Sequence, residues 1–163
     1  MADDDPIPEA PDEGALRRLL REARTIAVVG LSADWNRPSF FAAKYMQQHG
    51  YRIRPVNPRY AGGAILGERC VARLEEVDGP VDIVDVFRRT AEVGAIADSA
   101  IAIGAKCLWQ QIGVINHDAA AKARAAGLTT VMNRCVKIEH ARLFGGLHWA
   151  GVNTGIVSAR RRA

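Results

Sequence analysis

The stretch TIAVVGLSADWNRPSFFAAKYMQQHGYRIRPV, residues 25–56, contains the pattern that decides the fold. Its first residues form a short, β-branched apolar run that ends in Gly30, which is typical of a buried strand. A polar loop follows, and Pro38 suits the first turn of a helix that runs to about His49. A second strand covers residues 51–56. A strand, a helix and a strand of these lengths predict a βαβ unit with two parallel strands.

The alternation of strands and helices continues on both sides of this unit. Before it, Asp12 can cap a helix whose leucines recur at helical spacing. After it, the same patterns predict strands at 64–66, 81–87, 106–111 and 128–133, and helices at 71–77, 90–103, 116–126 and 136–143. We therefore expect one α/β domain of Rossmann type, an open and mostly parallel sheet with helices on both faces.

The length of 163 residues fits a single domain with a core of its own. We expect a flexible acidic arm at 1–12, because its prolines and aspartates cannot bury surface, then the domain at 13–144. Residues 145–163 form an extension with a basic end, and its apolar residues suit packing on this domain, on a protein partner or on a second copy. No apolar run is long enough to span a membrane, and the start lacks the features of a secretory signal. The three cysteines lie far apart, which favours reduced thiols in the cytoplasm.

Charge is distributed unevenly along the chain. Six of the 18 acidic residues and none of the 22 basic residues lie in positions 1–14, so the remainder carries a formal charge of +10. Such a body favours anionic partners, namely phosphorylated small molecules, nucleic acid or membrane surfaces. Charge alone does not choose among these.

Polar and cationic side chains follow the predicted strands at the edge where an open parallel sheet binds its ligands. The loop after the first strand departs from the GxGxxG dinucleotide fingerprint, since only the first of the three glycine positions, Gly30, holds glycine. Phosphate can still bind at the start of the next helix, with Ser32, Arg37 or Ser39 as donors. The alternative is that Ser39 begins the helix and Arg37 is a solvated loop charge.

The second strand ends in Asn57, Pro58 and Arg59, where NAD-binding proteins usually have Asp or Glu. A cation at this place matches a phosphorylated ribose, as in NADP or coenzyme A. With equal weight, Asn57 and Pro58 simply form a turn and Arg59 is solvated.

Several segments together resemble the small bacterial CoA-binding proteins, stand-alone relatives of the CoA-binding N-terminal domain of succinyl-CoA synthetase α subunits. They are GLSADWNRPS, GYRIRPVNPRYAGGAILGERC, PVDIVDVFRR, LWQQIGV and VMNRCVKIEHARL, in order between Thr25 and Leu143. The glycine-rich first loop of the synthetase is absent here. The synthetase's phosphohistidine belongs to a further domain, so the resemblance does not imply ligase activity.

The resemblance implies a ligand site built from three strand ends. The first loop holds the nucleotide end, and the other two segments line the ligand. The residues concerned are Gly30, Leu31, Ser32, Arg37, Pro38 and Ser39, then Val56, Asn57 and Pro58, then Val86, Phe87 and Arg88. From their positions after strands, we add Arg59 and Gln111 to the predicted site.

We predict no catalytic constellation and no metal site. The four histidines lack HExxH or Cys/His spacing, and neither GxSxG nor a P-loop sequence occurs. Cys135 is the one candidate for chemistry, because it opens a helix next to Arg134, where the helix dipole and a cation can lower a thiol pKa. The alternative, which we favour, is a buried packing residue.

The leading hypothesis is a protein that binds coenzyme A or an acyl-CoA, with a regulatory or carrier role and no catalysis. An NADP-dependent oxidoreductase is the alternative, although the glycine fingerprint is missing. A second alternative is a nucleic-acid-binding protein that uses the basic body and Arg160–Arg162, but basic and aromatic residues do not interleave as such proteins require.

Overall fold

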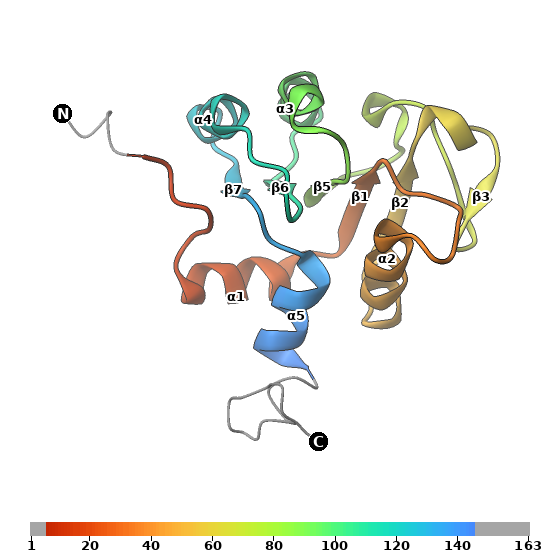
Figure 1. The fold of residues 1–163 in the computed structure, drawn as a ribbon, viewed down its shortest axis with the longest axis horizontal. Coiled ribbons are helices and arrows are strands. Elements are labelled where there is room, and N and C mark those ends of the chain that lie inside the picture. Colours follow the sequence, from red (N-terminus) through yellow and green to blue (C-terminus); the bar gives the residue numbers. More distant parts are fainter. Residues whose placement is uncertain (1–5, 146–163) are drawn as a thin grey trace.

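The computed structural model describes residues 6–145. The helices and strands alternate along the chain (Figure 1), and three 3-10 turns lie between them, at Pro58–Tyr60, Leu74–Glu76 and Thr90–Glu92. In order, the elements are α1 (Glu13–Glu22), β1 (Thr25–Val29), α2 (Pro38–Gln48), β2 (Arg52–Val56), β3 (Ala64–Ile65), β4 (Glu68–Arg69), β5 (Ile83–Val86), α3 (Val93–Ala102), β6 (Cys107–Gln110), α4 (His117–Ala125), β7 (Thr129–Val131) and α5 (Val136–Phe144).

The main sheet has five strands in the order β2-β1-β5-β6-β7, and every neighbouring pair is parallel. Helices α3 and α4 cover one face, and α1, α2 and α5 cover the other (Figure 1). From β1 the chain adds β2 on one side of the sheet, and it then returns to add β5, β6 and β7 on the other side. The direction in which strands are added therefore reverses between β1 and β5, and this pair marks the switch point of the sheet. The predicted Rossmann-type α/β fold is confirmed.

Three short segments differ from their predicted structure. The helix expected at 71–77 is reduced to a three-residue 3-10 turn, Leu74–Glu76, and the helix expected from Thr90 begins with a 3-10 turn. The strand expected at 64–66 pairs with the unpredicted strand β4 in a small antiparallel sheet. Each segment is shorter than the window over which hydrophobic periodicity distinguishes a helix from a strand.

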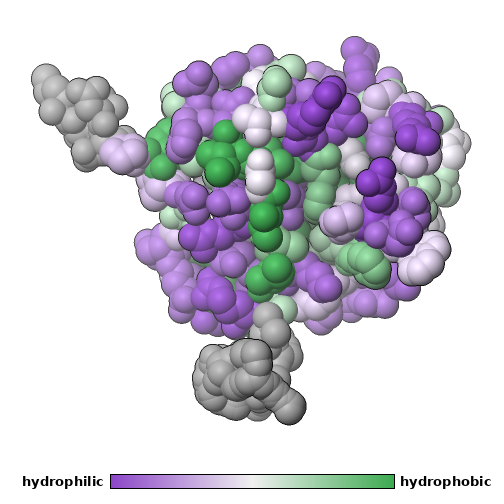
Figure 2. Space-filling model, viewed as in Figure 1, coloured by the Kyte–Doolittle hydropathy of each residue, from purple (hydrophilic) through white to green (hydrophobic). Residues whose placement is uncertain are grey.

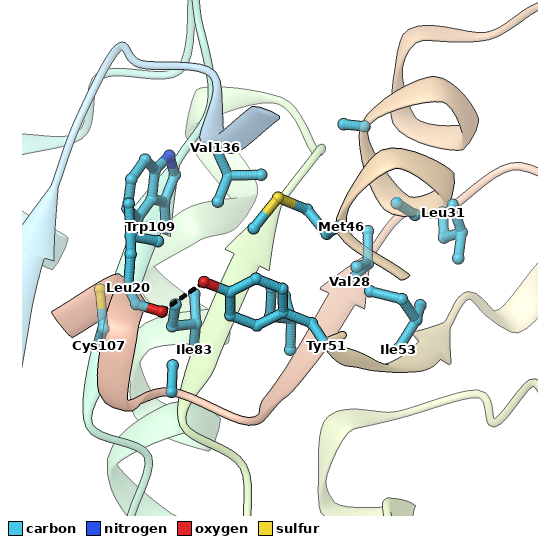
Figure 3. Close-up of a cluster of buried hydrophobic side chains, with 14 of the residues drawn as sticks. Leu20, Val28, Leu31, Met46, Tyr51, Ile53, Ile83, Cys107, Trp109 and Val136 are labelled. Atoms are coloured by element: carbon cyan, nitrogen blue, oxygen red, sulfur yellow. Dashed lines mark hydrogen bonds between the residues drawn. The ribbon is translucent and has the colours of Figure 1, made fainter. Parts of the chain in front are cut away.

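Separate hydrophobic clusters fill the two sides of the sheet. Under α1, α2 and α5, Trp109 and Met46 are fully buried, and the Tyr51 hydroxyl donates to the carbonyl of Leu20 (Figure 3). Under α3 and α4 the cluster is built largely from valine and alanine, which allows these helices to approach the sheet closely. The core therefore fixes the strand ends from both faces.

The described part of the acidic arm contacts the domain. The Met132 N–H donates to the Glu9 carbonyl at 2.6 Å, and the Glu9 carboxylate lies 4.0 Å from the Arg134 guanidinium. Glu9 is thus held beside the end of β7, whereas the flexibility expected of residues 1–12 stays a prediction. The predicted extension lies outside the described residues except for Gly145. Over the described range, no helix has the length and hydropathy needed to cross a bilayer.

Candidate functional site

Two connected cavities lie at the carboxyl ends of the parallel strands. The larger has a volume of about 1150 Å³ and the smaller about 400 Å³. They share five lining residues, namely Arg37, Pro38, Arg59, Phe87 and Arg88. Because the strand order reverses between β1 and β5, this is the place where open α/β sheets bind ligands.

Gly30 follows β1 and lies against the end of β5, at the switch point. Its φ is +91°, and a Cβ atom added there would lie 2.4 Å from the Phe87 carbonyl oxygen. The Gly30 N–H donates to the Val56 carbonyl at 2.8 Å. Any side chain here would push the ends of β1 and β5 apart, so glycine is required by both conformation and space.

Asn57 fixes the turn after β2 to the loop after β1. Its side chain is buried, its Nδ2 donates to the Leu31 carbonyl at 3.0 Å, and its Oδ1 accepts from the Arg59 N–H at 3.0 Å. The loop itself closes on the start of α2, where the Ser39 hydroxyl oxygen accepts from the Ser32 N–H at 3.0 Å. Asn57 and Ser39 therefore shape the site and, like Ser32 and Arg59, line the smaller cavity.

The cations of the site differ in their availability. Within residues 6–145, Arg37 and Arg59 take part in no ion pair, and both line the two cavities. Arg88 instead donates twice to the Glu92 carboxylate, at 2.9 and 2.7 Å, and this contact lowers the pKa of Glu92. Arg37 and Arg59 are thus the guanidiniums that an incoming phosphate can engage at no cost to an existing pair.

The opposite wall of the larger cavity is apolar. It consists of Ile112, Val114, Cys135 and Ile138, which we call the apolar half, in contrast to the cationic half around Arg37 and Arg59. The loops after β6 and β7 are tied together, since the Gly113 N–H donates to Asn133 Oδ1 at 2.9 Å. The Trp109 indole N–H donates to the Arg134 carbonyl at 2.8 Å, which fixes the start of α5.

A buried carboxyl lies below the boundary between the two halves. Asp85 is 1% exposed, and the Gln111 side-chain amide donates to it at 2.5 Å. Burial raises the pKa of Asp85 to about 7, while the bond from Gln111 opposes that shift. The strand register places Asp85 beside Trp109 and Val28, on the face covered by α1, α2 and α5. Gln111 also lines the larger cavity, so one side chain both holds Asp85 and reaches the predicted site.

Cys135 lines the apolar half and is the N-cap residue of α5. Burial raises the pKa of its thiol, and the backbone N–H groups of Ile138 and Lys137 offset only part of that effect. A raised pKa opposes the hypothesis that Cys135 is an activated thiolate. The reactivity of this thiol stays a prediction.

Most of the predicted site residues line one of the two cavities, but the structure places three elsewhere. Leu31, Val56 and Val86 are 0–2% exposed, and their side chains belong to the core. By packing in the core, they hold in place the strand ends from which the neighbouring residues reach the cavities. We missed Asp85 and the isoleucines of the apolar half. A charged residue in the middle of VDIVDVF was the available signal for Asp85. Ile112 and Ile138 lie in the segments LWQQIGV and VMNRCVKIEHARL, but nothing in those segments singled out the two isoleucines as site residues.

The fold and its cavity define a Rossmann-type domain with a cavity lined by guanidiniums at the switch point. A family model described as a CoA binding domain matches residues 24–141. The chain therefore belongs to this family of CoA-binding domains.

Relatives of similar length share most of the chain. The uncharacterized protein YneT of Bacillus subtilis (strain 168) is 38% identical over 131 residues, which cover 80% of this chain and 96% of YneT. The solved structure of cell-free ID.343 from Thermus thermophilus is 36% identical, with a TM-score of 0.80, and covers 82% of this chain and 100% of that chain.

A larger enzyme shares the fold. The dinucleotide-forming acetyl-coenzyme A synthetase 1 of Ca. Korarchaeum cryptofilum, solved with phosphate and ADP, is 21% identical with a TM-score of 0.62. The match covers 72% of this chain and 27% of the synthetase. At this identity the likeness concerns the fold alone.

Proposed function

We propose that this protein binds coenzyme A or an acyl-CoA along the carboxyl edge of its sheet, as a regulatory or carrier module rather than as a catalyst. The observation that carries the proposal is the pair of guanidiniums, Arg37 and Arg59, at a cavity on the switch point. Membership of the CoA-binding domain family supports the choice of ligand. The absence of a nucleophile or metal motif from the sequence supports a role without catalysis. Reduced, widely separated cysteines suit a protein of the cytoplasm.

The Rossmann arrangement gives the ligand a direction. A nucleotide places its adenosine beside the end of β2 and its diphosphate at the loop after β1. We therefore assign the 3′-phosphate of CoA to Arg59, and the diphosphate to Arg37, Ser32 and the positive end of the α2 dipole. The pantetheine arm then runs past Phe87 towards Gln111, across the boundary into the apolar half.

Calorimetry with CoA and dephospho-CoA tests this assignment on wild type and Arg59→Ala. A charged hydrogen bond contributes about 1.5–3 kcal/mol, so the substitution should weaken CoA binding about tenfold to a hundredfold. Binding of dephospho-CoA, which lacks the 3′-phosphate, should change little. The control is Arg18→Ala, which removes an exposed guanidinium from α1 and alters the net charge equally.

The same titrations separate the alternatives. Arg59 also suits the 2′-phosphate of NADP, so binding of NADP without binding of CoA would replace this proposal by an oxidoreductase function. Affinity for an oligonucleotide that falls steeply with salt, with no response to CoA, would favour a nucleic-acid-binding function instead.

A further inference from the structure

The cavity continues beyond the place where the pantetheine arm ends. In the direction assigned above, the sulfur of CoA reaches the neighbourhood of Gln111, between the ends of β5 and β6. Ile112, Val114 and Ile138 line the cavity beyond this point. A ligand that ended in a free thiol would leave this wall in contact with water.

Two of these side chains are unusually exposed for isoleucine. Ile112 is 62% exposed and Ile138 is 46% exposed, although Ile112 comes from the loop after β6, Ile138 comes from the first turn of α5, and both line one cavity. Figure 2 shows strongly hydrophobic surface as a strip in the region of α5, with hydrophilic surface on either side. Single exposed apolar residues are common on proteins, but several that converge on one hollow indicate a contact surface.

We propose that the ligand is a thioester with a medium-length acyl chain, and that the chain lies on the apolar half, against Ile112, Val114 and Ile138. This inference rests on the proposed function, because CoA must first orient its sulfur towards Gln111. The acyl chain covers the apolar wall, while the nucleotide phosphates pair with Arg37 and Arg59. A single acyl-CoA then neutralises the charge of the cationic half and shields the apolar half from water.

A second copy of this chain could also cover the apolar half, but repulsion between like charges disfavours such a dimer. A two-fold contact through the apolar half would bring the same surface of both copies together. The four arginines on the opposite wall, Arg37, Arg59, Arg88 and Arg89, would approach their counterparts. Among the residues that the structure describes, Glu92 is the only acid that lines that cavity. Juxtaposed like charges disfavour such a contact.

The test is calorimetry of the full chain with CoA, acetyl-CoA, butyryl-CoA and octanoyl-CoA. A fully buried methylene contributes about 0.8 kcal/mol, which is about a fourfold gain in affinity. In a groove with one open side we expect about half of that free energy, or about twofold for each methylene. Octanoyl-CoA, with four more methylenes than butyryl-CoA, should therefore bind at least about tenfold more tightly.

A matched pair of variants locates the acyl chain. Ile112→Ser should reduce the ratio of the butyryl-CoA and octanoyl-CoA dissociation constants to about threefold or less. Ile115→Ser is the control, because Ile115 lies in the same loop and is 37% exposed but lines neither cavity. It should keep the wild-type ratio. Both positions are exposed loop residues, and thermal melts will show whether the variants fold like the wild type.

The outcomes are distinguishable. Binding of CoA with an affinity independent of acyl length would overturn the acyl proposal and leave the proposed function standing. No binding of CoA or any thioester would overturn both. Sedimentation that shows a dimer of the wild type, dissociated by Ile112→Ser, together with a flat acyl series, would assign the apolar half to an interface between copies.

Discussion

The two halves of the cavity are built in different ways. The cationic half comes from the ends of β1 and β2, which a single βαβ unit places side by side. The apolar half comes from the loops after β6 and β7 and from the first turn of α5, which meet only because the sheet is complete. Hydrogen bonds from buried side chains, such as that of Asn57 to Leu31, shape the cationic half, whereas the apolar half presents exposed isoleucines. In the proposed function, the phosphate contacts come from one local βαβ unit, whereas the surface proposed for the acyl chain is assembled from segments that only the complete sheet brings together.

The largest expected effect comes from breaking the junction between the halves with Gly30→Ala. The new Cβ would meet the Phe87 carbonyl at 2.4 Å, in a conformation that alanine disfavours. A left-handed alanine costs about 1–2 kcal/mol and the forced backbone shift about 1–3 kcal/mol more. We expect the free energy of unfolding in denaturant titrations to fall by about 2–5 kcal/mol, with CoA binding lost as well.

Gly127→Ala serves as the control for this substitution. Gly127 has a φ of +95°, but nothing lies within 4 Å of the position its Cβ would occupy. Only the conformational cost of about 1–2 kcal/mol applies there. Equal destabilisation by the two substitutions would contradict a close approach of β1 and β5 at Gly30.

A smaller effect, dependent on pH, is expected from the carboxyl at the boundary. Burial raises the pKa of Asp85 to about 7 in the folded protein, above the value of about 3.9 in the unfolded chain. Between these values the folded state binds more protons, so the contribution of Asp85 to stability is greatest at low pH and is lost as pH rises towards 7.

The isosteric substitution Asp85→Asn removes this titration. We expect the variant to be more stable than the wild type by about 1–3 kcal/mol at pH 8, because it avoids a buried charge. The advantage should shrink towards pH 5, as followed by urea unfolding at both values. A stability difference that does not change with pH would show that Asp85 keeps the same charge in both states.

The smallest effect is a change of rate at Cys135, the cysteine that is not fully buried. Burial raises the pKa of this thiol, so at pH 7.5 iodoacetamide should label it more slowly than a small free thiol. If the apolar half holds an acyl chain, saturating octanoyl-CoA should slow labelling further, about fivefold or more, and acetyl-CoA should protect less. Mass spectrometry of the alkylated peptide measures both rates.

Two results would count against this view of Cys135. Labelling faster than that of a free thiol would support the activated thiolate considered from the sequence. Equal protection by acetyl-CoA and octanoyl-CoA at saturation would place the acyl chain away from the apolar half. The Cys135→Ala variant identifies any signal from the buried Cys70 and Cys107.

The prediction from the sequence was most accurate where structure is local. Asp12 caps α1 by accepting from the Ala15 N–H, and Pro38 begins α2, as their residue types indicate. It was less accurate at residues 71–77 and at β4, because these segments are too short for hydrophobic periodicity to reveal their secondary structure. For the site, Arg37, Arg59 and Phe87 line the cavity, whereas Leu31, Val56 and Val86 lie in the core, and ligand binding by these residues stays a prediction. A position beside a strand end does not tell which way a side chain points.

The sequence by itself determined the elements, their alternation and the family, because propensity, capping and burial patterns act over a few residues. Only the tertiary structure decided the strand order β2-β1-β5-β6-β7, and with it which loops share a cavity. It alone showed that Gly30 abuts Phe87, that Gln111 holds a buried Asp85, and that Ile112 and Ile138 face one hollow. The physical reason is that each of these contacts joins residues brought together by packing of the whole sheet, and no local pattern records such a meeting.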